Sequence, residues 1–447
     1  MKKPYQLTDY KTVISDPVVI YQSPADMKQG WGYYQFPCLY RTSTGEILAS
    51  WCYSDDSVLK DGESVTAIKH AISSDNGKTW TPVLDSEIGR YRIVCKSAPT
   101  KDGKFFVSFG GDNGAKIPAE QITATPYAEG ELSFWYGKRK NKIYLASHIE
   151  KLELTDVNGR AVTQFKNPNV LRMNEWDPTT GENTTREVKL NWRHMSAGAG
   201  IDGDCLVITP MSYLFRINSS HGVIAKDGVL YYALYATGFD SSKEDIAEAS
   251  ASKACTYSSV YVMSSVDGGD TWNYLSRISA DDIPNFAPEL NVEGAGEPYL
   301  NLMPDGTFAM LFRTGDNNMP MYIVRSSDDC KTWSTPVQFD FLGVLPQMLT
   351  LDCGVTIASY GRPRIFVRTT SDPTGKDWKE HIEIPLSPQS PTSNEHRLSC
   401  CYTHLLPTGA NTALLIHTDF HHPTGDGTFT KAIMVREIRI EPKESMG

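Results

Sequence analysis

One pattern recurs along this chain: an apolar run, a tight turn that contains glycine, and a second apolar run. The apolar runs are rich in Ile, Val, Phe, Tyr and Leu, which favour β-strands. Glycine adopts the positive φ that short hairpin turns often need without a steric penalty. The pattern occupies 38–51, 97–110, 221–235, 298–312, 347–360 and 402–416, with turn glycines Gly45, Gly103, Gly228, Gly306, Gly354 and Gly409. It therefore predicts six β-hairpins in a repeat architecture.

A second motif, Ser-x-Asp followed by Thr-Trp, comes after several of these hairpins. It reads SSDNGKTW at 73–80, SVDGGDTW at 265–272 and SSDDCKTW at 326–333, and SDPTGKDW at 371–378 looks like a degenerate copy with one inserted residue. The spacing leaves room for a third strand before each copy. Asp and Ser side chains bond turn amides, and Trp packs between neighbouring sheets. The motif is therefore interpreted as a structural turn that follows the third strand of a repeat.

These residues resemble the Asp-box, or BNR, repeat of sialidases, a family of six-bladed β-propellers. The resemblance extends from about residue 30 to about residue 420. It implies an all-β fold, a six-bladed β-propeller of the sialidase type, in which residues 1–447 form a single domain. The Asp boxes of that family lie on turns away from the active face, so the resemblance implies a structural role for them.

The turn glycines are unevenly spaced. Gly103 and Gly228 are separated by 125 residues, more than any other neighbouring pair. Residues 111–215 are therefore expected to contain a large insertion after the second hairpin, a further hairpin, or both. The insertion is also the segment through which a homo-oligomer would form. The early strand at 12–21 and the last strand at 430–440 are expected to close the ring by sharing one blade.

In a propeller blade, the start of the first strand and the end of the second lie on the same face. Titratable residues at these places are therefore candidates for a catalytic funnel. Sialidases hold the substrate carboxylate with three arginines, and use an Asp as acid/base and a Tyr nucleophile assisted by a Glu. The resemblance assigns the Glu to Glu297, two arginines to Arg313 and Arg362, and the acid/base to Asp61, with Asp55 and Asp56 as competitors. Glu297 and Arg313 lie at opposite ends of one hairpin and are expected to be neighbours.

Two positions depart from the sialidase pattern. Gln35 stands where the family has its first arginine, and a neutral amide cannot make the charge-assisted, bidentate pair that guanidinium makes with a carboxylate. Cys400 stands where the family has its nucleophilic Tyr, counting back from the proline of the sixth turn. Tyr402 lies two residues on, so it faces the same side of a regular strand and is the candidate nucleophile if the register shifts. Gln35 is expected to bind a hydroxyl or amide of the substrate.

Polar residues near the third and sixth hairpins complete the candidate site. His221 lies at the start of the third hairpin segment, and His396 and Arg397 precede the sixth; all three are predicted to bind substrate. Further His and Asp residues at 417–422 offer metal ligands, or the base and acid of a β-elimination. No spacing matches a standard zinc signature, so neither a metal nor a cofactor is predicted.

Two carboxylates that flank a bond suffice for glycoside hydrolysis, one protonating the leaving oxygen and one attacking or activating water. We therefore predict an exo-acting glycoside hydrolase that removes a terminal, acidic sugar from an oligosaccharide or glycoconjugate, with sialic acid as one option. Two alternatives stay open: a propeller lyase acting on a uronate-containing glycan, and a catalytically inactive glycan-binding propeller. A lyase would give an unsaturated product that absorbs in the near ultraviolet, and an inactive propeller would bind without turnover.

The composition excludes several other classes of protein. The chain has 43 basic and 53 acidic residues, a net charge of −10, which argues against nucleic-acid and anionic-membrane partners. No segment approaches the roughly 18 apolar residues that span a bilayer. The nine cysteines are scattered and odd in number, which favours free thiols in a reducing compartment. The N-terminal segment lacks the apolar core of a signal peptide, so a cytoplasmic location is expected, although a protein whose leader had been removed would look the same.

Overall fold

The computed structural model describes most of the chain. The described residues are 7–24, 32–53, 68–91, 93–94, 98–110, 115–126, 128–134, 137–149, 151–162, 170–191, 196–202, 205–210, 223–236, 257–287, 294–315, 319–362, 364–387 and 399–443. Their strands form six sheets, and their helical content is limited to α1 (Ala146–Ile149) and three short 3-10 turns. The predicted all-β class is therefore confirmed. Within these ranges, no helix has the length and apolar character that a bilayer crossing requires.

The chain divides into two compact units, and unit 1 comprises residues 1–95, 301–309 and 342–447. It contains three antiparallel sheets, with the strand orders β6-β5-β4-β3-β7, β24-β25-β26-β27 and β1-β30-β29-β28, where β2 also pairs with β30. The first sheet consists of β3 (Tyr33–Thr42), β4 (Ile47–Tyr53), β5 (Ile68–Ser73), β6 (Thr81–Val83) and β7 (Ile93–Val94). The second consists of β24 (Val344–Thr350), β25 (Thr356–Gly361), β26 (Ile365–Thr370) and β27 (Ile382–Ile384). The third consists of β1 (Tyr10–Ile14), β2 (Val18–Gln22), β28 (His404–Gly409), β29 (Thr412–Pro423) and β30 (Phe429–Pro442).

Unit 2 comprises residues 96–300 and 310–341. One sheet has the order β20-β21-β22-β23 and consists of β20 (Gly296–Leu302), β21 (Phe308–Arg313), β22 (Met321–Ser326) and β23 (Val337–Asp340). A seven-stranded sheet has the order β16-β17-β18-β19-β13-β12-β8. It consists of β8 (Phe105–Gly110), β12 (Val170–Asp177), β13 (Glu182–Asn191), β16 (Ile224–Lys226), β17 (Val229–Ala236), β18 (Ser259–Ser265) and β19 (Thr271–Ile278).

Most of the predicted hairpins are present as paired strands. They are β3–β4, β16–β17, β20–β21, β24–β25 and β28–β29. The second prediction, over 97–110, is borne out in part among the described residues. An antiparallel bridge joins Pro99 to Phe105 across a turn at Lys101–Gly103, but the described residues before this turn form no strand. Strand β8 also pairs with β12, from far along the chain, which the local pattern could not show.

The segment that was expected to carry an insertion contributes to two sheets. Strands β12 and β13 extend the seven-stranded sheet, where β13 runs parallel to β19. The other strands form a five-stranded sheet in the order β10-β11-β14-β15-β9. They are β9 (Ala115–Pro118), β10 (Ala128–Phe134), β11 (Gly137–Leu145), β14 (Ser196–Asp202) and β15 (Cys205–Pro210).

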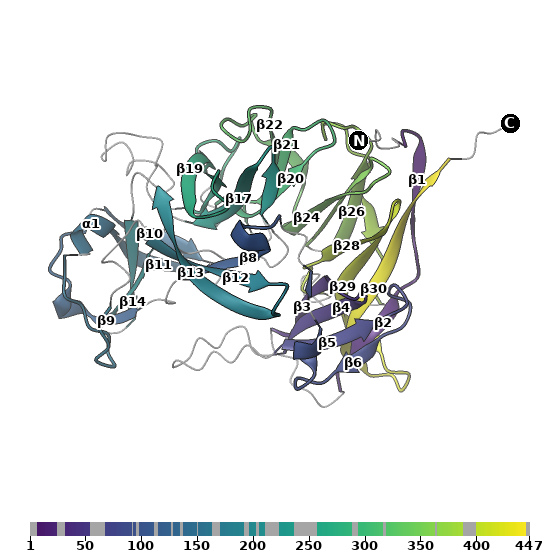
Figure 1. The fold of residues 1–447 in the computed structure, drawn as a ribbon, viewed down its shortest axis with the longest axis horizontal. Coiled ribbons are helices and arrows are strands. Elements are labelled where there is room, and N and C mark those ends of the chain that lie inside the picture. Colours follow the sequence, from purple (N-terminus) through teal and green to yellow (C-terminus); the bar gives the residue numbers. More distant parts are fainter. Residues whose placement is uncertain are drawn as a thin grey trace. The chain divides into compact units, whose positions relative to one another are not determined.

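The two ends of the chain share one sheet, as predicted. Residues Tyr10–Ile14 pair with Ile438–Pro442, and β2 pairs with the earlier part of β30. Figure 1 shows the purple strands β1 and β2 beside the yellow strand β30. This pairing holds a strand from one end of the sequence against a strand from the other end. The closure of the sheets into a six-bladed ring stays a prediction.

The sheet of β28, β29 and β30 is buried on both faces. Leu405 and Leu415 pack into an apolar cluster with β24 and β25, whereas Leu406 and Leu414 pack into a second cluster with β3 and β4. Neighbouring residues of a strand point to opposite faces. A continuous apolar run such as 413–416 therefore fits a sheet that lies between two others.

The Ser-x-Asp motifs form turns that are held by their own side chains. In the first, Ser73 Oγ donates to Asp75 Oδ1 at 2.8 Å and accepts from the backbone N–H of Gly77 at 2.8 Å. The same carboxylate accepts from the backbone N–H of Thr79 at 2.9 Å. A hydrogen bond from the Thr79 hydroxyl, with these backbone bonds, lowers the pKa of Asp75 to about 2. We refer to 73–80, 265–272, 326–333 and 370–378 as the Ser-Asp turns.

The other Ser-Asp turns repeat these bonds after the third strand of a sheet. The Oδ1 atoms of Asp267 and Asp328 accept backbone N–H groups at 2.8 and 3.0 Å. In the degenerate copy, Thr370 takes the place of the first serine: its Oγ1 accepts the backbone N–H of Asp372 at 3.0 Å. Asp372 then accepts backbone N–H groups through both of its oxygens, which accommodates the inserted residue. The motif is thus a structural turn, as the sequence predicts.

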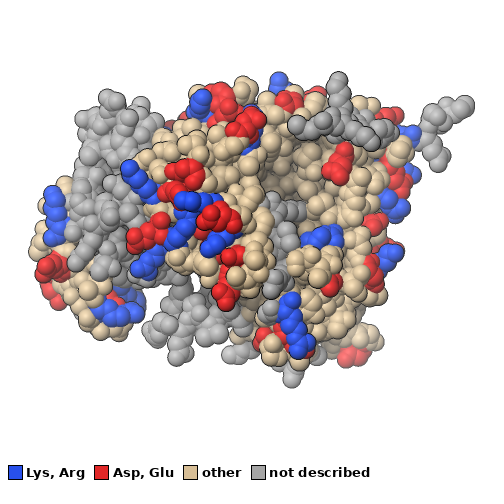
Figure 2. Space-filling view, viewed as in Figure 1, with Lys and Arg blue, Asp and Glu red and all other residues tan. Residues whose placement is uncertain are grey.

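Charges of both signs are interspersed over the described surface in Figure 2. On the face in view, Lys and Arg side chains lie beside Asp and Glu side chains rather than gathering into one large basic area. A basic stripe is the usual electrostatic footprint of a nucleic-acid-binding protein. The visible face does not present one.

Candidate functional site

A strained backbone position recurs at the start of several hairpins. Phe36, Glu297, Leu345 and Cys401 all have positive φ, at 54, 44, 41 and 63°. Each lies near the beginning of the first strand of its hairpin, from three residues before the strand at Cys401 to its fourth residue at Phe36. Each is nine residues before a turn residue, which is Gly45, Gly306, Gly354 or Ala410. Non-glycine residues rarely adopt this conformation, and such strain concentrates at functional sites. The recurring positive φ therefore marks four segments as candidates. We call the segments around Phe36, Glu297, Leu345 and Cys401 the inner-strand starts.

Glu297 is the only charged residue of this set, and it forms a buried ion pair. Its Oε2 lies 3.2 Å from Nε of Arg313, and the two side chains are 4% and 6% exposed. The hairpin brings the start of β20 against the end of β21, so the two predicted neighbours are in contact. Burying a charged group is costly unless an opposite charge and hydrogen bonds accompany it. The ring of Tyr235 packs beside Gly296, directly before the glutamate.

In unit 1, Arg362 follows β25 and lies next to the vicinal cysteines. Gly361 has no room for a side chain, because an added Cβ would lie 2.3 Å from the carbonyl oxygen of Cys401. The close approach places Arg362 against the Cys401 thiol, with which it hydrogen-bonds. Burial raises the pKa of Cys401 to about 12 and also raises the pKa of Cys400. Both thiols are therefore protonated and unreactive at neutral pH.

Gln35 is fully buried at the start of β3, between the left-handed residues Tyr34 and Phe36. Neither its amide oxygen nor its amide nitrogen has a hydrogen-bond partner within the described part of the chain. The strand register shifts on both sides of Gln35, which is typical of β-bulges that redirect a side chain. An unpaired buried amide costs about 1–3 kcal/mol, so a partner such as water or a ligand is expected there.

Residues 400–402 do not form the regular strand expected from the sequence. Strand β28 begins only at His404, and Cys401 is left-handed. The alternation that would turn Cys400 and Tyr402 to the same side therefore does not apply. The Tyr402 ring instead packs against Phe36, with centroids 5.1 Å apart. The backbone of Phe36 also hydrogen-bonds the sulfur of Cys400, so these segments from β3 and before β28 are in contact.

Two further buried groups lie near this contact: Lys431, which was not a predicted site residue, and His417, one of the His and Asp residues considered at 417–422. Lys431 donates from Nζ to the carbonyl oxygen of Tyr33 at 3.2 Å and lies 4.5 Å from the centroid of the Phe420 ring. Its burial lowers its pKa to about 8, although the neighbouring Cys400 opposes this shift. His417 is fully buried, and burial followed by the charge of Arg436 lowers its pKa to about 4. A lysine at the start of an apolar strand gave no signal of burial in the sequence.

Four predicted site residues, Asp61, His221, His396 and Arg397, lie outside the described residues. The competitors Asp55 and Asp56 lie outside them as well. Within the described ranges, no group of three or more His, Cys, Asp or Glu side chains has a metal-binding arrangement. The proposed roles of Asp61, His221, His396 and Arg397 stay predictions.

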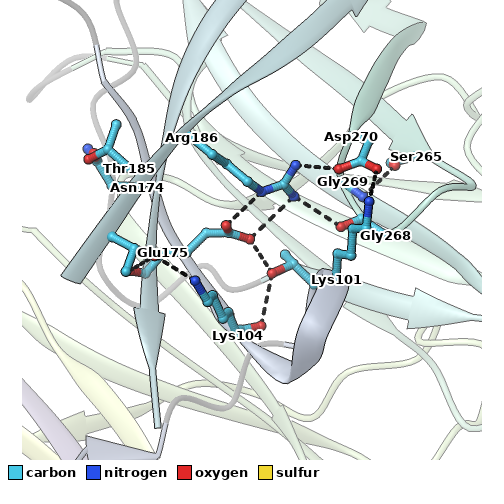
Figure 3. A network of polar contacts seen from close by, with 12 residues as sticks. Lys101, Lys104, Asn174, Glu175, Thr185, Arg186, Ser265, Gly268, Gly269 and Asp270 are labelled. Atoms are coloured by element: carbon cyan, nitrogen blue, oxygen red, sulfur yellow. Dashed lines mark hydrogen bonds and ion pairs between the residues drawn. The ribbon is translucent and has the colours of Figure 1, made fainter. Parts of the chain in front are cut away.

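A second buried carboxylate in unit 2 contrasts with Glu297. Glu175 is 1% exposed, accepts a hydrogen bond from Thr100 and pairs with Nε of Arg186 at 2.7 Å. Figure 3 shows Arg186 between Glu175 and Asp270, and Lys101 donates to Asp270 at 2.8 Å. Both glutamate oxygens are bonded and Asp270 belongs to a Ser-Asp turn. The network therefore ties β12 and β13 to that turn, which is a structural role.

Comparisons with known proteins place the chain only at the level of the fold. No protein-family model and no curated protein matches its sequence. A solved structure of a protein of unknown function from Dyadobacter fermentans DSM 18053 matches with a TM-score of 0.55 and 15% identity. The match covers 96% of this chain and 99% of that one, so the two share a fold along almost their whole length.

Sialidase structures match more weakly. The NanB sialidase of Streptococcus pneumoniae matches with a TM-score of 0.40 and 16% identity, over 95% of this chain and 70% of that one. The intramolecular trans-sialidase of Ruminococcus gnavus also has a TM-score of 0.40 and 16% identity, over 94% and 96% of the two chains. A TM-score of 0.40 is too low to define the fold or the activity of this chain.

Proposed function

We propose that this chain is an exo-acting glycoside hydrolase of the sialidase type, which removes a terminal acidic sugar from a glycan. The observation that carries the proposal is the buried pair of Glu297 and Arg313. Glu297 combines a charged side chain, near-complete burial and a left-handed backbone. A buried ion pair adds little stability, because desolvation offsets most of the attraction, and Glu297 differs from the structural Glu175 in its left-handed backbone at an inner-strand start. Catalytic sites, in contrast, use such groups.

In this proposal, the chain closes into a six-bladed propeller with Asp-box repeats, and Glu297 assists the nucleophile. Arg313 and Arg362 bind the anionic group of the sugar, because guanidinium forms charge-assisted bonds to carboxylates. Asp61 is the acid/base, and His221, His396 and Arg397 contact the substrate. The substrate is an oligosaccharide or glycoconjugate, and the protein acts in the cytoplasm.

Gln35 and Tyr402 set this hypothetical enzyme apart from the sialidase pattern. The amide of Gln35, which has no hydrogen-bond partner among the described residues, supports a role in binding a hydroxyl or amide of the substrate, which would satisfy both of its polar atoms. Tyr402 remains the proposed nucleophile, since the neighbouring thiols are protonated. Gln35 is neutral, whereas the sialidase pattern has a positively charged arginine at this position. The part of the sugar that contacts Gln35 is therefore expected to be less negatively charged than the group that an arginine would bind.

The proposal is tested by turnover of 4-methylumbelliferyl glycosides of sialic acid, glucuronic acid and galactose. We expect one acidic glycoside to be hydrolysed, and Glu297→Gln to lower kcat by roughly 10² to 10⁴, the range typical of a lost acid–base or nucleophile-assisting group. Glu182→Gln, which changes an exposed glutamate of β13, is the matched control and should keep full activity.

Full activity in both Glu297→Gln and Asp61→Asn would contradict the proposal. A product that absorbs in the near ultraviolet from a uronate-containing glycan would identify a lyase instead. Binding of the glycosides without any turnover would leave only a glycan-binding propeller.

A further inference from the structure

Gln35 on strand β3 is unusual among the buried polar side chains of the described residues. It is fully buried, and neither Oε1 nor Nε2 has a hydrogen-bond partner within that part of the chain. The other buried side chains in this condition, such as those of His417 and Ser259, lack a partner at one atom only. A buried amide without partners loses the hydrogen bonds that water would make to its acceptor and to its donors. A methionine, which has a similar length and no amide, would avoid this cost.

The polar groups that neighbour Gln35 are bonded to one another. The backbone of Phe36 hydrogen-bonds the sulfur of Cys400. The Oγ1 atom of Thr418 accepts the backbone N–H of Cys400 at 3.0 Å and pairs with the hydroxyl of Ser399 at 2.9 Å. These groups are therefore engaged without Gln35, and both ends of its amide are left for a molecule from outside the chain.

The backbone on either side of Gln35 is strained. Tyr34 and Phe36 both have a φ of 54°, and the strand register shifts on both sides of Gln35. Strain of this kind costs free energy and persists where it is part of a functional site. The segment also borders the surface, because Phe36 and Tyr402, whose rings pack together, are only half-buried. Aromatic rings offer apolar faces against which a sugar ring packs.

We propose that Gln35 determines the specificity of the substrate site by binding two neighbouring hydroxyls of the sugar. This inference rests on the proposed function, which places Gln35 at the substrate. An amide presents an acceptor and a donor side by side, and two neighbouring hydroxyls match both, because each hydroxyl can donate or accept. A carboxylate has acceptors only and leaves Oε1 of Gln35 unpaired, so the site selects against a charged group at this position. A site built to hydrogen-bond a hydroxyl also rejects an analogue that lacks it.

The first test measures binding without turnover, by isothermal titration calorimetry of the full chain. The probes are methyl β-glucuronide and its analogues that each lack one ring hydroxyl. We expect the wild-type chain to bind two analogues, those that lack neighbouring hydroxyls, about tenfold more weakly than the glucuronide. Gln35→Met should bind the glucuronide about tenfold more weakly and should no longer distinguish it from these two analogues.

Two results of this titration would overturn the proposal. One is an equal loss of affinity for the same analogues in the wild-type chain and in Gln35→Met. The other is a wild-type Kd above about 10 mM for the glucuronide itself. Gln22→Met is the control for binding, because Gln22 is an exposed glutamine of β2 whose amide donates to Thr430 at 2.9 Å, and it should leave every affinity unchanged.

The second test is the thermal unfolding of the ligand-free chain. Gln35→Met should raise Tm by about 2 °C, because it removes buried polar atoms that have no partner. Gln347→Met is the matched control: Gln347 is also buried near a left-handed residue, Leu345, but it has a partner within the protein, so its loss should lower Tm. A lower Tm in Gln35→Met would show that the Gln35 amide is already satisfied and would overturn the proposal. Neither test uses turnover, so an absence of hydrolysis would contradict the proposed function and leave these two results standing.

Discussion

The sheets that contain β3, β20 and β24 each have a Ser-Asp turn at one end and an inner-strand start at the other, and these two ends are encoded in different ways. At the Ser-Asp turns, the side chains repeat: Asp75, Asp267, Asp328 and Asp372 all accept turn amides. At the inner-strand starts, only the backbone repeats, and its left-handed position carries Phe36, Glu297, Leu345 or Cys401. The Ser-Asp turns secure the fold through local hydrogen bonds. The inner-strand starts keep a common backbone conformation and vary their side chains, which is the arrangement expected where function resides on a scaffold.

The largest effect is expected from Gly361→Ala, at the end of β25, where the chain packs against the inner-strand start that contains Cys401. An added Cβ would lie 2.3 Å from both Cβ and the carbonyl oxygen of Cys401, and backbone cannot move aside cheaply. We expect a loss of about 3 kcal/mol or more in the free energy of unfolding, measured by denaturant unfolding. Gly45→Ala is the control: it has positive φ but open space, so its loss should be about 1 kcal/mol. Equal losses would show that the Gly361 contact is not tight.

A smaller effect is expected from Glu175→Ala, in the ion-pair network that holds β12 against the Ser-Asp turn at 265–272. The substitution removes the Glu175 carboxylate that pairs with Nε of Arg186, whereas the ion pair of Arg186 with Asp270 remains. We expect a loss of about 2–3 kcal/mol in the free energy of unfolding, somewhat below the usual cost of breaking a buried pair. Turnover per folded molecule should not change, in contrast to Glu297→Gln. A loss of turnover with unchanged stability would give Glu175 a role in the reaction. It would then contradict the distinction between structural Ser-Asp turns and functional inner-strand starts.

The smallest effect is expected from acid titration of the Ser-Asp turns. Turn hydrogen bonds hold the pKa of Asp75 and Asp328 at about 2, below the ordinary value of 3.8. A carboxyl whose pKa is lower in the folded state stabilises the fold above its unfolded pKa. This stabilisation should therefore be complete above about pH 4 and fall as the pH drops toward 2. Thermal unfolding across this range measures it, and Asp328→Asn should flatten the dependence; an unchanged slope would contradict the assignment.

Much of the fold could be predicted because its signals are local. Strand alternation, turn glycines and Ser-x-Asp side chains act over a few residues, so they appear directly in the sequence. The contact of Glu297 with Arg313 followed from the same logic, since one hairpin joins them. At 97–110 the described residues keep only a bridge from Pro99 to Phe105, whereas β8 pairs fully with β12, and no local pattern contains a partner so distant in the chain.

The all-β class, the Ser-Asp turns and the pairing of the first strands with the last can be read from the sequence. Which side chains meet at the inner-strand starts depends on tertiary packing. The left-handed Cys401 ended the alternation on which the prediction for Tyr402 depended, and the packing of Gly361 against Cys401 brought Arg362 to the thiols. Such contacts arise between segments distant in sequence, where packing overrides local preference. The burial of the Gln35 amide, without a hydrogen-bond partner among the described residues, is likewise a product of packing.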